Sequence, residues 1–123
     1  MVQVFKPANL RVEYDVKTNM RDQVSLSSDI YFPIGTGPWP VILIRTPYNN
    51  QMPELIIESA TYFAQNGYVV VSQDVRGRFD SDGIFEPWVN EFNDGYDTIE
   101  WIGKQTWCNG NVGMHGPSYV GNV

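Results

Sequence analysis

Ser118 follows a short apolar run and lies between two glycines, an arrangement of residue types that can serve acyl transfer. Residues 112–121 read VGMHGPSYVG. A serine hydrolase needs its hydroxyl lifted off a strand end by a sharp turn, with a helix beginning at once so that its first N–H groups face the developing oxyanion. Gly116 and Gly121 would let strand and helix approach closely. The spacing G-x-S-x-x-G alone indicates a plain turn sooner than a nucleophile, so the preceding elements must decide.

The elements expected before the serine include several β-strands. Apolar and polar residues alternate over 12–16 and 24–32 around a polar stretch at 18–22, which predicts an antiparallel hairpin with one buried face. The continuous apolar runs VILI at 41–44 and VVV at 69–71 predict strands covered on both faces, as in a parallel sheet. The run at 112–114 predicts a further parallel strand immediately before the glycine-serine turn.

Two helices are expected between these strands. Pro53 suits a first helical position and Gly67 a C-terminal cap, so residues 53–66 are predicted to be helical. Acidic residues crowd the start of 94–105, as the helix dipole favours, and a second helix is predicted there. Its buried stripe would consist of Tyr96, Ile99 and Ile102. The order β-β-β-α-β-α-β predicts an α/β protein opened by a hairpin. A serine placed after such elements leaves nucleophile and plain turn both open.

Composition narrows the class of protein. The chain has 123 residues, 42% of them hydrophobic, which is typical of a globular domain or a piece of one. A net charge of −6 argues against nucleic acid as a partner. Neither a membrane-spanning run of roughly 20 apolar residues nor a secretory leader is recognisable, so a cytoplasmic location is the default expectation. Cys108 is the single cysteine, and no Cys/His cluster has zinc spacing, so no metal and no cofactor are expected.

Several further motifs occur in a fixed order along the chain. They are MRD at 20–22, RTPY at 45–48, DVRGR at 74–78, DGYDT at 94–98, WCNG at 107–110 and GPSYVG at 116–121. In these motifs the chain resembles the cocaine esterase / X-Pro dipeptidyl-peptidase family of α/β-hydrolases, which includes the α-amino-acid ester hydrolases. The resemblance implies that residues 1–123 are the N-terminal part of one α/β-hydrolase domain. That part would end at the nucleophile elbow, before the cap and the β-rich C-terminal domain.

The resemblance also assigns roles. It implies that Ser118 is the nucleophile of a serine hydrolase, forming an acyl-enzyme with the carbonyl of a small ester, amide or short peptide. The oxyanion would be bound by the backbone N–H of Tyr119 and the hydroxyl of Tyr48. X-Pro peptides, α-amino-acid esters, β-lactams and other bulky esters all stay open as substrates, as does the oligomeric state. The triad acid and base are missing after the serine, so the chain alone is expected to be inactive or nearly so.

Other residues admit plainer explanations. Asp74 and Arg76 lie at the ligand-binding edge of the predicted sheet, where a structural ion pair is the favoured role. His115 precedes the serine and is not expected to be the base, because α/β-hydrolases place acid and base after it. Four aromatic residues of the long loop would either line an acyl pocket or hold the loop against the domain: Phe79, Phe85, Trp88 and Phe92.

Two rival classes are weighed against the hydrolase. A non-catalytic α/β module could bind a ligand or partner at the strand ends. A dinucleotide-binding domain is disfavoured, because no G-x-G-x-x-G motif follows the strand at 41–44.

Overall fold

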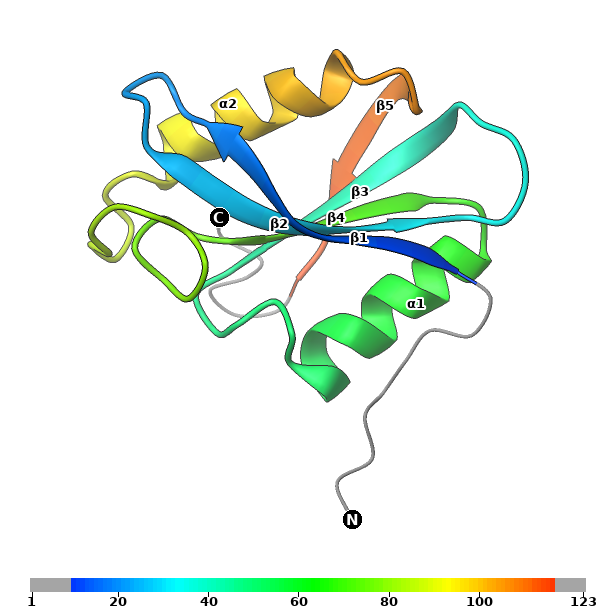
Figure 1. The fold of residues 1–123 in the computed structure, drawn as a ribbon, viewed down its shortest axis with the longest axis horizontal. Helices are drawn as coiled ribbons and strands as arrows, with labels where there is room; N and C mark the ends of the chain where they lie inside the picture. The colour runs from blue at the N-terminus through cyan, green and yellow to red at the C-terminus, as the bar shows by residue number, and fades with distance from the viewer. Residues whose placement is uncertain (1–9, 117–123) are drawn as a thin grey trace.

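Five strands form one mixed sheet in the order β1-β2-β4-β3-β5 (Figure 1). The computed structural model describes residues 10–116. The strands are β1 (Arg11–Asn19), β2 (Ser25–Phe32), β3 (Trp39–Thr46), β4 (Val69–Asp74) and β5 (Cys108–Met114). β1 and β2 form an antiparallel hairpin, β2 runs antiparallel to β4, and β3 is parallel to both β4 and β5. The predicted α/β architecture, with an opening hairpin followed by parallel strands, is confirmed.

The helices lie on opposite faces of the sheet, α1 (Glu58–Gln65) on one and α2 (Glu91–Gly103) on the other (Figure 1). The first predicted helix opens with a π-helical turn, η1 (Pro53–Ile57), before α1. The second begins three residues before the predicted position 94. Its acidic side chains extend from 91 to 100, so they do not mark one first turn. Within residues 10–116, no helix is long and apolar enough to cross a membrane.

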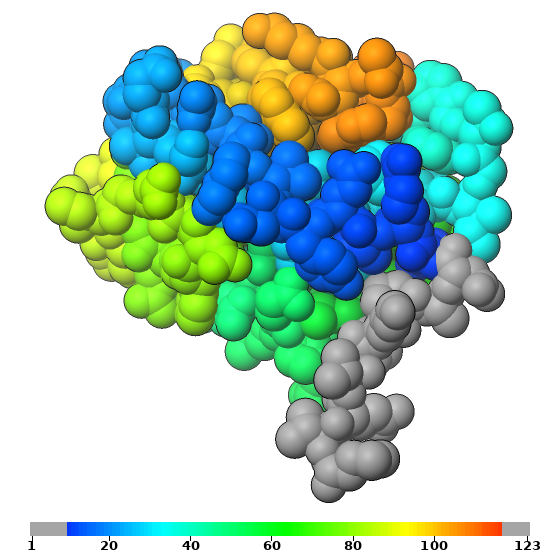
Figure 2. Space-filling model, in the orientation of Figure 1, coloured from blue at the N-terminus to red at the C-terminus, as the bar shows by residue number. Residues whose placement is uncertain are grey.

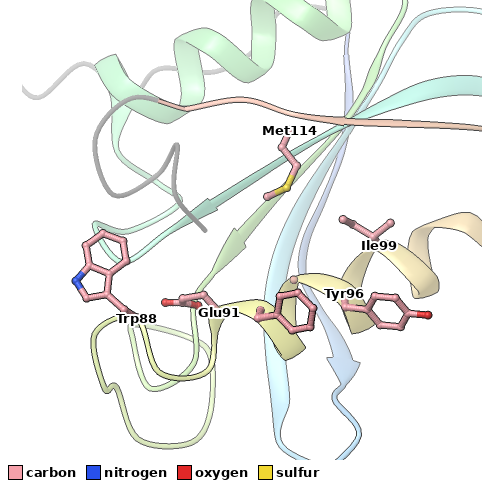
Figure 3. Close-up of a pocket in the computed structure, with 7 residues that line it drawn as sticks. Trp88, Glu91, Tyr96, Ile99 and Met114 are labelled. Carbon is pink, nitrogen blue, oxygen red and sulfur yellow. The ribbon is translucent and has the colours of Figure 1, made fainter.

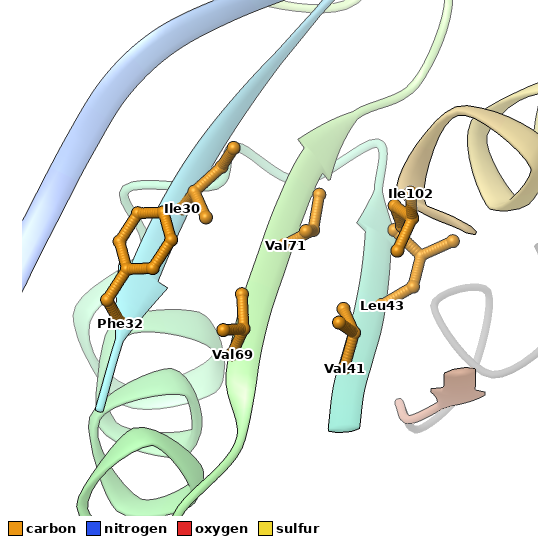
Figure 4. Close-up of a cluster of buried hydrophobic side chains, with 7 residues drawn as sticks. All are labelled: Ile30, Phe32, Val41, Leu43, Val69, Val71 and Ile102. Carbon is orange, nitrogen blue, oxygen red and sulfur yellow. The ribbon is translucent and has the colours of Figure 1, made fainter. Parts of the chain in front are cut away.

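Alternate residues of the central strands pack against different helices. One cluster faces α2 and joins the three central strands through Ile102 (Figure 4). Its buried members are Ile30, Phe32, Val41, Leu43, Val69, Val71 and Ile102. A second cluster on the other face joins Tyr31, Ile44 and Val70 to η1 and α1. Both faces of the central strands are therefore covered, as their continuous apolar runs predict.

The buried face of α2 differs from the predicted stripe. Ile102 is fully buried, but Tyr96 is 55% exposed. The buried residues of α2 are Glu91, Asp94, Gly95, Thr98 and Ile102, which recur at helical spacing. Polar side chains occupy this face because partners on the sheet side bind them, and a search for apolar spacing cannot find such a face.

The long connection between β4 and α2, residues 75–90, lies against the tip of the β1–β2 hairpin. Figure 2 shows this yellow-green segment beside the blue hairpin on one face of the molecule. The N–H of Asp82 donates to the carbonyl of Ser25 over 2.8 Å. The connection begins at the carboxyl end of β4, which is the edge where the predicted site lies. This hydrogen bond holds it against the hairpin near that edge.

Candidate active site

The predicted oxyanion donor Tyr48 lies at the carboxyl end of β3, beside the end of β4. Thr46 of β3 is directly opposite Asp74, the last residue of β4. Tyr48 follows two residues later, with its backbone N–H donating to Thr46 Oγ1 over 2.8 Å. Its side chain is 40% exposed. The hydroxyl is therefore not committed to the core, which was the alternative role for a tyrosine here.

β5 leads the chain to the same edge of the sheet. It lies parallel to β3, with Leu43 opposite Met114. The N–H of His115 continues this pairing by donating to the carbonyl of Leu43 over 3.1 Å. Carboxyl ends of neighbouring parallel strands meet at one edge, which is where open α/β sheets bind ligands. Ser118 and Tyr119 lie outside the described residues, so their predicted placement beside Tyr48 stays a prediction.

His115 packs against helix α1 rather than facing the α2 side of the sheet. Its exposed ring meets Phe63 edge-on, with 5.0 Å between ring centroids. This contact occupies one side of the imidazole with an aromatic ring. The contact gives the histidine a packing role, and its exclusion as the triad base stays a prediction.

Asp74 is completely buried at the end of β4. Its Oδ1 accepts a hydrogen bond from the N–H of Asn50 at 2.9 Å, and its Oδ2 accepts one from the N–H of Asp80 at 3.4 Å. Burial raises the pKa of the Asp74 carboxyl to about 6, and these two N–H groups oppose that rise. The carboxyl thus joins two loops at the candidate site.

The ion pair predicted between Asp74 and Arg76 is not formed. Arg76 binds Asp94 of α2, with 2.8 Å between Nη2 and Oδ1, and Asp22 at the hairpin tip, also at 2.8 Å. Asp94 and then Asp22 raise the pKa of the guanidinium. Arg76 therefore fastens the hairpin to α2, while Asp74 is bound by backbone N–H groups.

Sequence reasoning gave no role to Arg45, which is completely buried beneath this edge. Its Nη1 lies 3.1 Å from Glu91 Oε1, and its Nε donates to Gln73 Oε1 over 2.7 Å. The pair ties the end of β3 to the first turn of α2. One sequence signal was available, because an arginine directly after the buried run 41–44 requires an acidic partner elsewhere.

A pocket of about 480 Å³ lies between the start of α2 and the end of β5. Figure 3 shows Met114 of β5 projecting toward Trp88, Tyr96 and Ile99 on the opposite side. Phe92 also lines this pocket, whereas Phe85 packs against Val75. Of the four aromatics, Trp88 and Phe92 line this cavity, Phe85 helps to hold the loop, and Phe79 is 53% exposed beside Arg78. An acyl-binding role for the cavity stays a prediction. Within residues 10–116, no group of acidic, His and Cys side chains could hold a metal ion.

Comparison with known proteins connects this arrangement to hydrolases. The family model described as X-Pro dipeptidyl-peptidase (S15 family) matches residues 22–123. Cocaine esterase of Rhodococcus sp. (strain MB1 Bresler) is 45% identical over 116 residues, covering 92% of this chain and 20% of the esterase. The chain thus spans about a fifth of the length of this relative.

Solved structures give the same result. A CocE/NonD family hydrolase from Staphylococcus aureus superposes with a TM-score of 0.79 at 31% identity, over 90% of this chain and 23% of that chain. An α-amino acid ester hydrolase superposes with a TM-score of 0.78 at 31% identity, over 98% of this chain and 24% of that chain. A Pyrococcus furiosus esterase, 18% identical with a TM-score of 0.73, supports the fold alone.

Proposed function

This chain belongs to the X-Pro dipeptidyl-peptidase (S15) family, and on that premise we propose that the protein of which it forms the N-terminal part is a serine hydrolase. The fold of the chain is the opening part of an α/β-hydrolase fold. The proposed reaction is cleavage of an ester or amide bond through an acyl-enzyme on Ser118. Residues 1–123 would then be an incomplete domain, inactive when separated from the rest of the protein.

One observation supports this proposal most directly. The parallel neighbours β3 and β5 end at the same edge of the sheet, where Tyr48 follows β3, and the GPSYVG motif at 116–121 follows β5 in the sequence. A nucleophile and an oxyanion donor must both reach one carbonyl group, so they must lie at a common edge. A serine in a plain turn would need no such neighbour.

The proposed chemistry balances in two steps. Ser118 Oγ attacks the carbonyl carbon as a base takes its proton, and the negative charge moves to the carbonyl oxygen. Tyr48 Oη–H and the N–H of Tyr119 would donate to that oxygen. The leaving group then departs with a proton, and water hydrolyses the acyl-enzyme. We assign the base and its orienting acid to parts of the protein outside this chain.

For the substrate we propose a small ester. Similarity to cocaine esterase at 45% identity supports this choice over X-Pro peptides and α-amino-acid esters. Those substrates remain comparison arms in the experiment, since an α-amino-acid ester hydrolase also resembles the chain.

Labelling of the full-length protein with a fluorophosphonate probe tests the proposal. We expect stoichiometric labelling of the wild type and none of Ser118→Ala. Ser59→Ala in α1 is the matched control and should label as the wild type does. A folded wild-type protein that takes up no probe would contradict the proposal and favour a non-catalytic binding module. Hydrolysis rates with p-nitrophenyl acetate, alanine p-nitrophenyl ester and Ala-Pro p-nitroanilide then rank the substrate classes.

A further inference from the structure

Tyr48 lies in a loop whose backbone is fastened on both sides of the tyrosine. We call residues 47–51 the Tyr48 loop and residues 75–82 the β4-exit loop. Before the tyrosine, Arg78 Nε donates to the carbonyl of Pro47 over 3.0 Å. After it, the N–H of Asn50 donates to Asp74 Oδ1 over 2.9 Å. In both hydrogen bonds, the side chain that binds the loop backbone lies outside the Tyr48 loop: Asp74 is in β4 and Arg78 is in the β4-exit loop.

The Tyr48 loop needs this external support. Asn49, next to the tyrosine, has a φ of +88°, a left-handed conformation that few residues other than glycine adopt, although asparagine tolerates it better than most. Such conformations persist where the surrounding structure imposes them, and they cluster at functional sites. Asn49 and the exposed Tyr48 therefore lie together between two fixed points.

The carboxyl of Asp74 is itself rigidly placed. It is completely buried, and its second oxygen accepts the N–H of Asp80 from the β4-exit loop. The carbonyl of Asp74 accepts the hydroxyl of Ser81 over 2.5 Å, and that hydroxyl oxygen accepts the N–H of Ser27 over 2.8 Å. One residue thus connects the Tyr48 loop to a segment anchored on the hairpin strand β2.

The sheet does not require a carboxyl at this position. β3 and β4 are already paired in register from Val41 opposite Val69 to Thr46 opposite Asp74. Burial raises the pKa of Asp74 to about 6, with Asp80 and Asp29 adding to the rise through their negative charge. Holding an ionised group there at neutral pH is therefore unfavourable for folding. Because the Asp74 carboxyl lowers stability, its presence at this position needs an explanation other than stability.

We propose that Asp74 and Arg78 are positioning residues that hold the Tyr48 hydroxyl ready for the oxyanion formed when Ser118 attacks its substrate. The inference rests on the proposed function, in which Tyr48 is an oxyanion donor. Such donors act because they are fixed before the charge develops, and a misplacement of about 1 Å can lower the rate 100-fold. Because Tyr48 is 40% exposed and lies outside the strands, the fastening of its loop backbone helps to set where its hydroxyl lies.

A double-mutant cycle in the full-length protein tests this role. Tyr48→Phe should lower kcat for p-nitrophenyl acetate by about 10²–10³-fold. Asp74→Asn should lower kcat by roughly 10- to 100-fold with KM unchanged, because the position of the donor affects the transition state and not substrate binding. In the Tyr48→Phe background, Asp74→Asn should cost less than about twofold, since no hydroxyl remains to be positioned.

Two further variants protect the test against misfolding. Arg78→Met removes the hydrogen bond to Pro47 but keeps an unbranched apolar stem beside Phe79 and Phe85, so it should fold and show the same dependence on Tyr48. If Asp74→Asn fails to fold, the Arg78→Met cycle decides. Asp82→Asn changes an exposed carboxyl in the same loop and should leave kcat unaltered. Thermal unfolding and circular dichroism establish that each variant is folded.

The possible outcomes distinguish a failure of this inference from a failure of the proposed serine-hydrolase function. Equal losses of kcat in the wild-type and Tyr48→Phe backgrounds, or no loss with either positioning variant, would overturn the inference while Ser118 labelling leaves the hydrolase intact. Full kcat in Tyr48→Phe, with Ser118 still labelled, would also overturn it. Absence of Ser118 labelling in the folded wild type would remove the proposed function, and the inference with it.

Discussion

Gly77 occupies a backbone position that an alanine cannot share. Its φ is +75°, and a Cβ there would lie 2.1 Å from the backbone nitrogen of Phe85 and 2.4 Å from the carbonyl carbon of Ile84. Both atoms belong to the backbone, so relief would require the whole loop to move. We expect Gly77→Ala to lower the free energy of unfolding by about 2 kcal/mol or more. Urea denaturation of the full-length protein measures the loss.

Gly67 provides the matched control. Its φ of +94° is also left-handed, but an added Cβ would meet nothing within 4 Å. Gly67→Ala should therefore cost only the conformational preference, about 1 kcal/mol. Equal losses of unfolding free energy at the two glycines would contradict the prediction that the contact with residues 84–85 destabilises Gly77→Ala.

The buried carboxyl of Asp74 makes a second prediction, concerning pH. Its pKa is about 6 in the folded protein, against an ordinary value of 3.8. The folded state therefore holds the proton more tightly, and this group makes folding less favourable as pH rises from about 4 to about 6. The Asp74→Asn variant lacks this effect. Relative to the wild type, its stability should rise by up to about 3 kcal/mol across that window.

Urea denaturation at pH 4.5 and pH 7 tests the pH prediction, because any fixed effect of the amide cancels in the comparison. Asp29, whose pKa burial also raises, is present in both proteins. Asp82→Asn, an exposed change, should follow the wild type at both pH values. A difference between Asp74→Asn and wild type that does not vary with pH would contradict the prediction.

At the scale of single residues, the sequence predicted where a residue lies along its strand better than which residue it binds. Tyr48 lies after the end of a predicted strand and is 40% exposed, while its role as an oxyanion donor stays a prediction. Asp74 and Arg76 were paired because they are close in sequence, and that pairing was wrong. The true partners of Arg76 lie 54 positions before it and 18 positions after it. Such contacts depend on how the hairpin and α2 pack, which spacing along the chain does not reveal.

Between elements, Arg76 forms a polar link that the sequence analysis did not predict. It joins the β1–β2 turn to α2 through Asp22 and the almost completely buried Asp94. Removing the guanidinium would leave the Asp94 carboxylate buried without its cation. We expect Arg76→Gln to destabilise the protein by about 3 kcal/mol, which thermal or urea denaturation will measure.

The neighbouring pair Arg21 and Asp97 connects the same two elements and is the control. Arg21 binds Asp97 through Nε and Nη2, but 53% of its side chain is exposed. Solvent screens such a pair, so Arg21→Gln should produce a much smaller loss than Arg76→Gln. Similar losses would mean that burial of Asp94 is not the decisive factor.

Elements themselves could be predicted because their signals are local. Apolar alternation located the hairpin, and the runs at 41–44 and 69–71 located β3 and β4. Less local signals failed: polar partners decide which face of α2 is buried, so Tyr96 was wrongly included. The π-helical turn at Pro53–Ile57 also escaped prediction, because its residues have ordinary helical character.

In the whole molecule, strand order was beyond reach of the residues alone. β4 lies between β2 and β3, so the order of the strands in the sheet differs from their order in the chain. Apolar runs indicate that a strand is central but not which strand lies beside it. The superposition on solved hydrolases agrees with this fold, whose strand order physical reasoning on local sequence could not supply.

The outer edge of β5 leads to the last prediction. Among the described strands β5 pairs only with β3, so its other edge presents unpaired backbone groups. The apolar pocket formed by residues such as Trp88, Phe92 and Met114 lies beside it. Open edges next to apolar surface promote pairing between chains. A polypeptide of residues 1–123 produced alone should therefore self-associate at micromolar concentrations.

Gly113→Lys tests whether this edge is the point of contact. Gly113 lies within β5, and a Cβ there would meet nothing within 4 Å, so a lysine fits and places a charge on the edge. Sedimentation velocity should show less association of this variant than of the unchanged polypeptide. Gly103→Lys, in equally open space at the end of α2, adds the same charge elsewhere and should associate as before. Equal effects of the two lysines would indicate general charge repulsion, whereas a selective effect at residue 113 identifies β5 as the edge through which these chains meet.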